Sequence, residues 1–169
     1  ALRGTQGERV YGIVDAAIDS DLPFEAQLRF GARMQSLFLP EVAEALWDVA
    51  PYLVTVDPSS PYLEHWARRW GKSVGVLLCA RAEFDTLAAH LRSVFVVKDE
   101  TGQDYFFRFY DPRVLHAFLP TCTPAQMAEF FGPIRAFVCE SLDAAQVVSY
   151  VVDRGTLARR ADEIPATIS

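Results

Sequence analysis

The chain has 169 residues, of which 51% are hydrophobic, and its net charge is −6. This is enough apolar material for one domain with a core, and too much for a disordered protein. The acidic balance argues against nucleic acid as a ligand, because no basic block would neutralise phosphates. No apolar run approaches the ~18 residues typical of a membrane span, so no membrane association is expected.

Strands and helices are predicted to alternate along the chain. Strands are expected at residues 11–17, 51–56, 74–80, 94–97, 105–110 and 134–140, with a short strand or turn at 34–38. Helices are expected after Pro23 and at residues 42–49, 61–70, 84–95, 112–119 and 124–131. Residues 99–102 are expected to turn a hairpin. Thr123 and Gln126 have the spacing of a capping box.

The alternation through residues 51–98 suggests βαβ units, and the hairpin adds antiparallel pairing. We therefore predict an α/β fold, a mixed β-sheet with helices packed on it. Residues 1–140 are expected to form one domain. Residues 141–169 include a more polar tail, and we interpret them as a C-terminal docking arm or as an added β-element of the same domain.

Cysteines and histidines show no metal-binding or disulfide pattern. Cys79, Cys122 and Cys139 are odd in number and have no C-x-x-C spacing. The three histidines are isolated from one another in sequence, and no H-E-x-x-H motif occurs. We therefore expect no metal and no cofactor, and the cytoplasm is the simplest compartment.

The most informative stretch is the run at residues 105–115, YFFRFYDPRVL, which joins an aromatic strand to a helix. Alternation along a strand would place Arg108 on the same face as Tyr110, against the protein interior. Asp111 is a good N-cap, and the following proline suits the first helical position. A purely structural account therefore explains Asp111 well.

The two arginines of this run leave two interpretations open. Arg108 could be satisfied by a neighbouring carboxylate, and Arg113 could be an ordinary first-turn surface residue. A cation at a helix start opposes the helix dipole, however, and arginine is favoured at interfaces for its planar fork. Structure and partner binding explain Arg108 and Arg113 equally well.

A G-x-S-x-G pattern at residues 71–75 matches the sequence motif of a nucleophile elbow but not the order of secondary structure that the elbow requires. Such an elbow needs a strand before Ser73 and a helix after it. Here a helix is predicted before it and a strand after it. We therefore interpret the pattern as a helix-to-strand turn, with Gly71 ending the helix.

Two further arrangements keep an enzyme open as the alternative function. His116 could meet Cys122 as a thiol–imidazole pair. Asp15 could form a carboxylate pair with Asp19 or Asp21. A surface histidine near a loop cysteine, and solvated loop acids, explain the same residues without catalysis, so we expect no enzymatic activity.

Five segments resemble, in the same order, a family of small bacterial domains long catalogued as of unknown function. The family contains the effector chaperones, or adaptors, of type VI secretion. The clearest of these segments is similar to its RFYDPRVL signature. In chain order, the matching segments are residues 11–17 (YGIVDAA), 36–38 (SLF), 50–54 (APYLV), 90–92 (HLR) and 108–115 (RFYDPRVL). The resemblance runs from about residue 11 to residue 140.

The resemblance implies a non-enzymatic, cytoplasmic function. Members bind a cognate toxic effector and help to load it onto the secretion spike protein, VgrG. On this basis we expect Arg108, Tyr110, Asp111 and Arg113 to organise a shared structural or partner-binding feature.

Other surfaces and another role remain open beside this hypothesis. Trp66, Trp70 and the C-terminal tail could face an effector, although core packing fits both tryptophans better. A purely structural subunit of a larger assembly is a third possible role.

Overall fold

The computed structural model describes residues 7–98 and 101–164, which form one domain. Its strands are β1 (Arg9–Asp15), β2 (Met34–Ser36), β3 (Pro51–Val56), β4 (Gly75–Ala80), β5 (Val96–Lys98), β6 (Asp104–Phe106), β7 (Ile134–Glu140), β8 (Gln146–Asp153) and β9 (Thr156–Glu163). Its helices are α1 (Asp21–Phe30), α2 (Pro40–Ala43), α3 (Tyr62–Ala67), α4 (Phe84–Phe95), α5 (Pro112–Phe118) and α6 (Pro124–Phe131), with a 3₁₀ turn at Leu119–Thr121.

Seven strands form the central sheet in the order β2-β3-β1-β4-β7-β8-β9, and each neighbouring pair in it is antiparallel. β3 and β4 both run opposite to β1, so they are parallel to each other but separated by it. The β3-α3-β4 unit is therefore a split crossover, and its two strands do not pair directly. The predicted α/β class, a sheet with helices packed on it, is confirmed.

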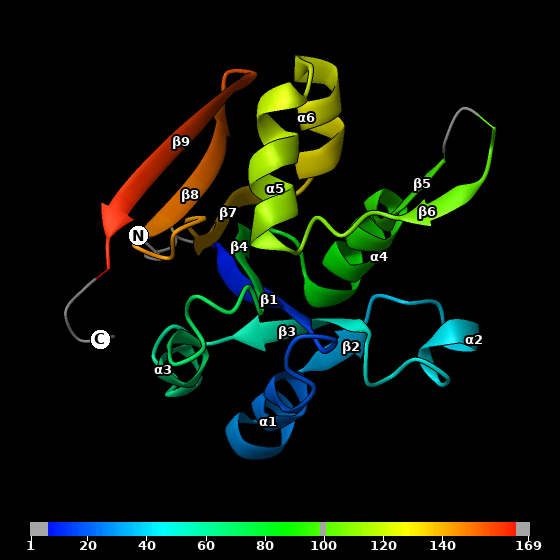
Figure 1. The fold of residues 1–169 in the computed structure, drawn as a ribbon, viewed down its shortest axis with the longest axis vertical. Helices are drawn as coiled ribbons and strands as arrows, with labels where there is room; N and C mark the ends of the chain where they lie inside the picture. Colours follow the sequence, from blue (N-terminus) through cyan, green and yellow to red (C-terminus); the bar gives the residue numbers. More distant parts are fainter. Residues whose placement is uncertain (1–6, 99–100, 165–169) are drawn as a thin grey trace.

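Helices cover both faces of this sheet (Figure 1), with α1 and α3 on one side and α4, α5 and α6 on the other. The α3 side is packed so closely that a Cβ on Gly12 of β1 would lie 2.6 Å from the Trp66 ring. On the opposite face, the Phe137 ring of β7 lies between 5.2 and 5.3 Å from the rings of Phe130 and Phe131 in α6. The core therefore has two layers, one between each face of the sheet and the helices that cover it.

Two helix starts follow the local sequence signals. Asp111 caps α5, its side chain accepting the backbone N–H of Arg113, and Pro112 occupies the first turn. Thr123 and Gln126 form the predicted capping box of α6. Both predictions are confirmed. They could be made from sequence because capping depends only on neighbouring residues.

The predicted strand at residues 105–110 is wrong in its extent. β6 ends at Phe106, and a turn follows in which the Asp111 N–H donates to the Arg108 carbonyl at 3.0 Å. The alternation assigned to these residues therefore does not apply, and Arg108 is not interior: its side chain is 45% exposed. Of the predicted hairpin turn, residues 99 and 100 lie outside the described residues.

Beyond residue 140, the chain adds two strands to the edge of the sheet. β8 pairs with β7, and β9 pairs with β8 in a continuous register from Asp153 opposite Thr156 to Gln146 opposite Glu163. The two strands are joined by Arg154 and Gly155, both with positive φ, which is typical of a two-residue hairpin turn. The last five residues of the predicted arm, 165–169, lie outside the described residues.

Candidate functional site

Asp15 ends β1 with a carboxylate that is almost fully buried, at 1% exposure. One carboxylate oxygen accepts the backbone N–H of Ala17 at 3.1 Å, and the other accepts the guanidinium of Arg108 at 2.6 Å. A buried charge is costly without a partner. Arg108 therefore neutralises an acid that is 93 residues away in sequence.

Asp111, also buried, is held by Arg113. The carboxylate accepts Nε of Arg113 at 2.9 Å and a terminal nitrogen at 2.6 Å, a two-pronged pairing that adds to the N-cap bond. Burial acts to raise the pKa of Asp111, but the hydrogen bonds and charge of Arg113 outweigh it and lower the pKa below its ordinary value. The Arg113 side chain itself remains 61% exposed.

Arg108 links the two acids and an aromatic ring. It lies 4.0 Å from the Asp111 carboxylate, and its guanidinium carbon is 5.9 Å from the centre of the Tyr110 ring. The hydrogen bond to Asp15 raises the pKa of Arg108. Tyr110 is buried, and this burial raises the pKa of its hydroxyl to about 12, so it stays neutral at physiological pH.

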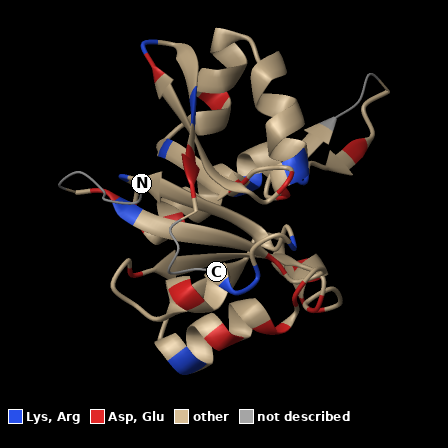
Figure 2. Cartoon of the chain, turned by 60° about the vertical axis from the view of Figure 1, so that its left-hand side comes forward, with Lys and Arg blue, Asp and Glu red and all other residues tan. Residues whose placement is uncertain are grey.

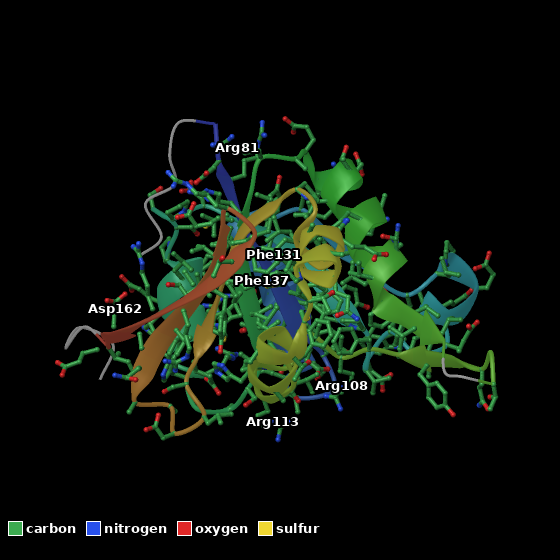
Figure 3. The ribbon with its side chains drawn as sticks, turned by 90° about the horizontal axis from the view of Figure 1, so that it is seen from above. Arg81, Arg108, Arg113, Phe131, Phe137 and Asp162 are labelled. Carbon is green, nitrogen blue, oxygen red and sulfur yellow. The ribbon has the colours of Figure 1, made fainter. Side chains whose placement is uncertain are left out.

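The four predicted site residues thus come together at one place, the junction of β1 and α5. Figure 3 shows Arg108 and Arg113 near each other at one end of the molecule. Tyr110 and Asp111 are buried, so within this group the two arginines present the exposed surface. We call Asp15, Arg108, Asp111 and Arg113 the arginine–aspartate cluster.

A row of aromatic rings connects this cluster to a nearby hairpin. The Tyr110 ring stacks with Phe95 of α4 at 6.1 Å between centroids, and Phe95 stacks with Phe106 of β6 at 5.2 Å. Phe106 also contacts the Phe38 ring at 5.3 Å. The position of the cluster and that of the hairpin are therefore mechanically linked through packed rings.

The β5–β6 hairpin itself exposes large apolar side chains, and Figure 1 shows it projecting away from the central sheet. Sequence reasoning missed this surface because it placed all of residues 105–110 in one strand that packs against the protein interior. We call it the hairpin surface; its members and exposures are Val96 39%, Val97 42%, Tyr105 49% and Phe106 56%.

Two mainly apolar cavities border the hairpin surface. One, of about 430 Å³, opens toward α6 and is lined by residues that include Phe107, Phe118 and Phe130. The other, of about 270 Å³, lies toward the segment before α2 and is lined in part by Phe38 and Phe106. Exposed apolar side chains next to apolar hollows are typical of sites that bind another molecule.

The residues weighed for thiol chemistry are engaged elsewhere. Nε2 of His116 lies 2.8 Å from the Glu140 carbonyl, which can only accept, so Nε2 donates; Nδ1 forms a hydrogen bond with the Tyr150 hydroxyl at 2.7 Å. The Cys122 thiol instead contacts the Phe118 carbonyl at 3.6 Å. The thiol nearest His116 is Cys139, at 3.8 Å, and burial raises its pKa to about 12, which disfavours a reactive thiolate.

The acids near the end of β1 do not form a carboxylate pair. Asp15 binds Arg108, whereas Asp19 accepts Nε of Arg69 at 2.6 Å. Burial acts to raise the pKa of Asp19, but the Arg69 hydrogen bond and backbone donors lower it overall. Asp21 donates its backbone N–H to Asp19 at 3.2 Å, in the turn that leads into α1.

The G-x-S-x-G segment connects α3 to β4, in the order that the sequence predicts. The buried Glu140 carboxylate accepts the backbone N–H of Gly71 at 2.7 Å and that of Ser73 at 2.8 Å. The Ser73 hydroxyl also donates to Glu140, at 3.1 Å. Ser73 therefore links the turn to β7 through hydrogen bonds from its backbone N–H and its hydroxyl to the Glu140 carboxylate.

The tryptophans differ in their exposure. Trp66 is buried, at 5%, beneath β1. Trp70 is partly covered, and its indole N–H donates to the Ala144 carbonyl at 2.9 Å. This bond ties the end of the α3 segment to the loop before β8.

A protein-family model described as "Domain of unknown function (DUF4123)" matches residues 10–129, more than half of the chain. The chain belongs to this family. The DUF4123 match includes the arginine–aspartate cluster and the hairpin surface but ends before β7. No curated protein and no solved structure matches the chain.

Two features are absent from the described residues of this DUF4123 chain. No group of three or more histidines, cysteines or acids in the described part is placed to hold a metal ion. Among the same residues, no helix has the length and apolar character to cross a membrane.

Proposed function

We propose that this DUF4123 chain is a non-enzymatic adaptor chaperone that acts in the bacterial cytoplasm. In this role it binds a cognate type VI secretion effector and helps to load it onto the VgrG spike. The observation that carries the proposal is the hairpin surface, a group of exposed apolar side chains bordered by two apolar cavities. A protein that works by binding another protein needs such a surface.

The arginines beside the hairpin surface support a protein partner. Arg108 and Arg113 are about half exposed while their charges are already neutralised by buried acids. Pairing with those acids fixes each guanidinium in place, so less side-chain entropy is lost when a partner binds. Aromatic residues and arginine are the types that contribute most to protein–protein affinity.

Co-purification tests this proposal directly. The full chain is expressed with a candidate toxin and with a candidate VgrG protein, and each is expected to co-purify with it. Recovery of the folded chain without either protein would argue heavily against an adaptor. A gene neighbourhood with a spike gene on one side and a toxin gene on the other is the matching genomic expectation.

A paired variant tests whether the hairpin surface is the one used. Val97 and Tyr105 face each other across the hairpin, and both are about half exposed. We expect Val97→Ser with Tyr105→Ser to reduce effector recovery at least tenfold while the chain stays folded. Leu28→Ser is the matched control, because Leu28 of α1 is an exposed apolar residue, at 81%, on a helix that packs against the opposite face of the sheet.

A further inference from the structure

The two edges of the central sheet differ in their capacity to pair with another strand. β2, at one edge, has three residues, whereas β9, at the other, has eight. Within the described residues, β9 pairs only with β8. A long edge strand presents a row of backbone groups that another strand can pair with.

Half of the β9 backbone points away from β8, and the register shows which half. Ser141 donates its N–H to the Gln146 carbonyl, so Gln146 pairs toward β7. Because this direction alternates along a strand, Val147 and every second residue after it pair toward β9. Val147 lies opposite Asp162, so the even-numbered residues of β9 pair inward. The outward-facing backbone groups therefore belong to Leu157, Arg159, Ala161 and Glu163.

A second copy of the chain fits this edge in only a few registers. In an antiparallel pair related by a two-fold axis, outward-facing residues must oppose one another, so the axis must pass through a residue of β9 rather than between two residues. An axis at Arg159 or at Arg160 would place an arginine against itself, and an axis at Asp162 would place an aspartate against itself. An axis at Ala161 places a small residue against itself instead.

The register centred on Ala161 also pairs every flanking charge with its opposite. Arg159 of one copy would lie opposite Glu163 of the other, and Arg160 opposite Asp162, each pair occurring twice. All four side chains are exposed. Figure 2 shows residues of both charges along the β8–β9 hairpin, and Figure 3 shows Asp162 at the outer rim of the molecule. Opposite charges facing each other across strands stabilise the pairing, and like charges oppose it.

We propose that β9 is a self-association site, at which two copies of this chain pair antiparallel about Ala161. The two sheets then continue across the interface, and the charges of β9 select this register over the one centred on Arg159. β9 lies outside the matched residues 10–129, so the inference does not depend on the adaptor function.

Charge-reversed variants of the full chain test the pairing by sedimentation. We expect the native chain to form dimers as its concentration rises toward about 1 mM, the weak end of specific affinity. Arg159→Glu with Arg160→Asp, and separately Asp162→Arg with Glu163→Arg, should each weaken self-association at least tenfold. An equimolar mixture of the two variants should restore dimers, because every opposed pair is then again of opposite charge.

A crosslink tests the register itself. Paired residues of this type have Cα atoms about 5.5 Å apart, within reach of a disulfide. In a Cys122→Ser background, Ala161→Cys should form a disulfide-linked dimer under mild oxidation. Ala158→Cys is the matched control, since it is a half-buried alanine of the same strand that pairs inward. A native chain that stays monomeric at about 1 mM, or equal crosslinking at both positions, would overturn the proposal.

Discussion

The arginine–aspartate cluster and the hairpin surface lie at two ends of one row of aromatic rings. They differ in whether their side chains already have partners within the fold. In the cluster, both buried carboxylates are held by arginines. On the hairpin surface, Tyr105 and Phe106 are half exposed beside apolar cavities. The comparison shows that the most conspicuous charges of this chain stabilise the fold, while the incompletely covered surface next to them is apolar.

The aromatic row is the connection whose loss should have the largest effect on stability. Phe95 is buried, at 2%, and stacks with both Tyr110 and Phe106. We expect Phe95→Ala to lower the free energy of unfolding by about 4 kcal/mol, from lost transfer energy and a residual cavity. Urea denaturation measures the change. A loss below about 1 kcal/mol would show that the hairpin and the cluster are not coupled through this ring.

Removing Arg108 should have the next largest effect, because it leaves Asp15 charged and buried without its partner. We expect Arg108→Ala to cost about 3 kcal/mol in urea denaturation. The double variant Arg108→Met with Asp15→Asn removes both charges and should cost clearly less. Equal losses in the two proteins would mean that the arginine contributes packing rather than charge neutralisation.

The Asp111–Arg113 pair should give the fold a smaller, acid-sensitive contribution. The folded pKa of Asp111 lies below its ordinary value of 3.8, so its contribution is present above that pH and is lost as pH falls through the folded pKa. Asp111→Asn keeps an N-cap side chain but cannot lose a charge. Thermal unfolding between pH 6 and pH 2 should therefore show a shallower acid slope for this variant than for the native chain.

Truncating Arg113 should have the smallest effect on stability. This variant therefore separates an effect on partner binding from an effect on folding. The side chain is 61% exposed, so Arg113→Ala should cost no more than about 1 kcal/mol, while the backbone N–H that Asp111 caps is retained. If the cluster contributes to a partner site, effector recovery should fall several-fold. Arg81→Ala is the control, because Arg81 is exposed and lies far from Arg113 in Figure 3. If the Arg113 variant unfolds and shows no separate binding defect, the cluster has only a structural role.

Local signals predicted the parts of the site that depend on neighbouring residues. Asp111 and Thr123 cap their helices because capping requires only a suitable side chain two or three positions before a free N–H. The prediction of a strand through residues 105–110, immediately before the Asp111 cap, was wrong. The composition of this segment favours a strand, but the chain turns after Phe106 to enter α5, and the resulting position of the rings depends on α4.

By itself, the sequence determined the starts of α5 and α6, the α/β class and the family resemblance, since these follow from short-range patterns and ordered motifs. Only the tertiary structure decided that β1 lies between β3 and β4, that Arg108 binds Asp15, and that His116 binds Tyr150 rather than Cys122. These contacts join segments between 34 and 93 residues apart, or depend on strand order. Periodicity reports which face of an element is buried, but it carries no information about which distant element covers it.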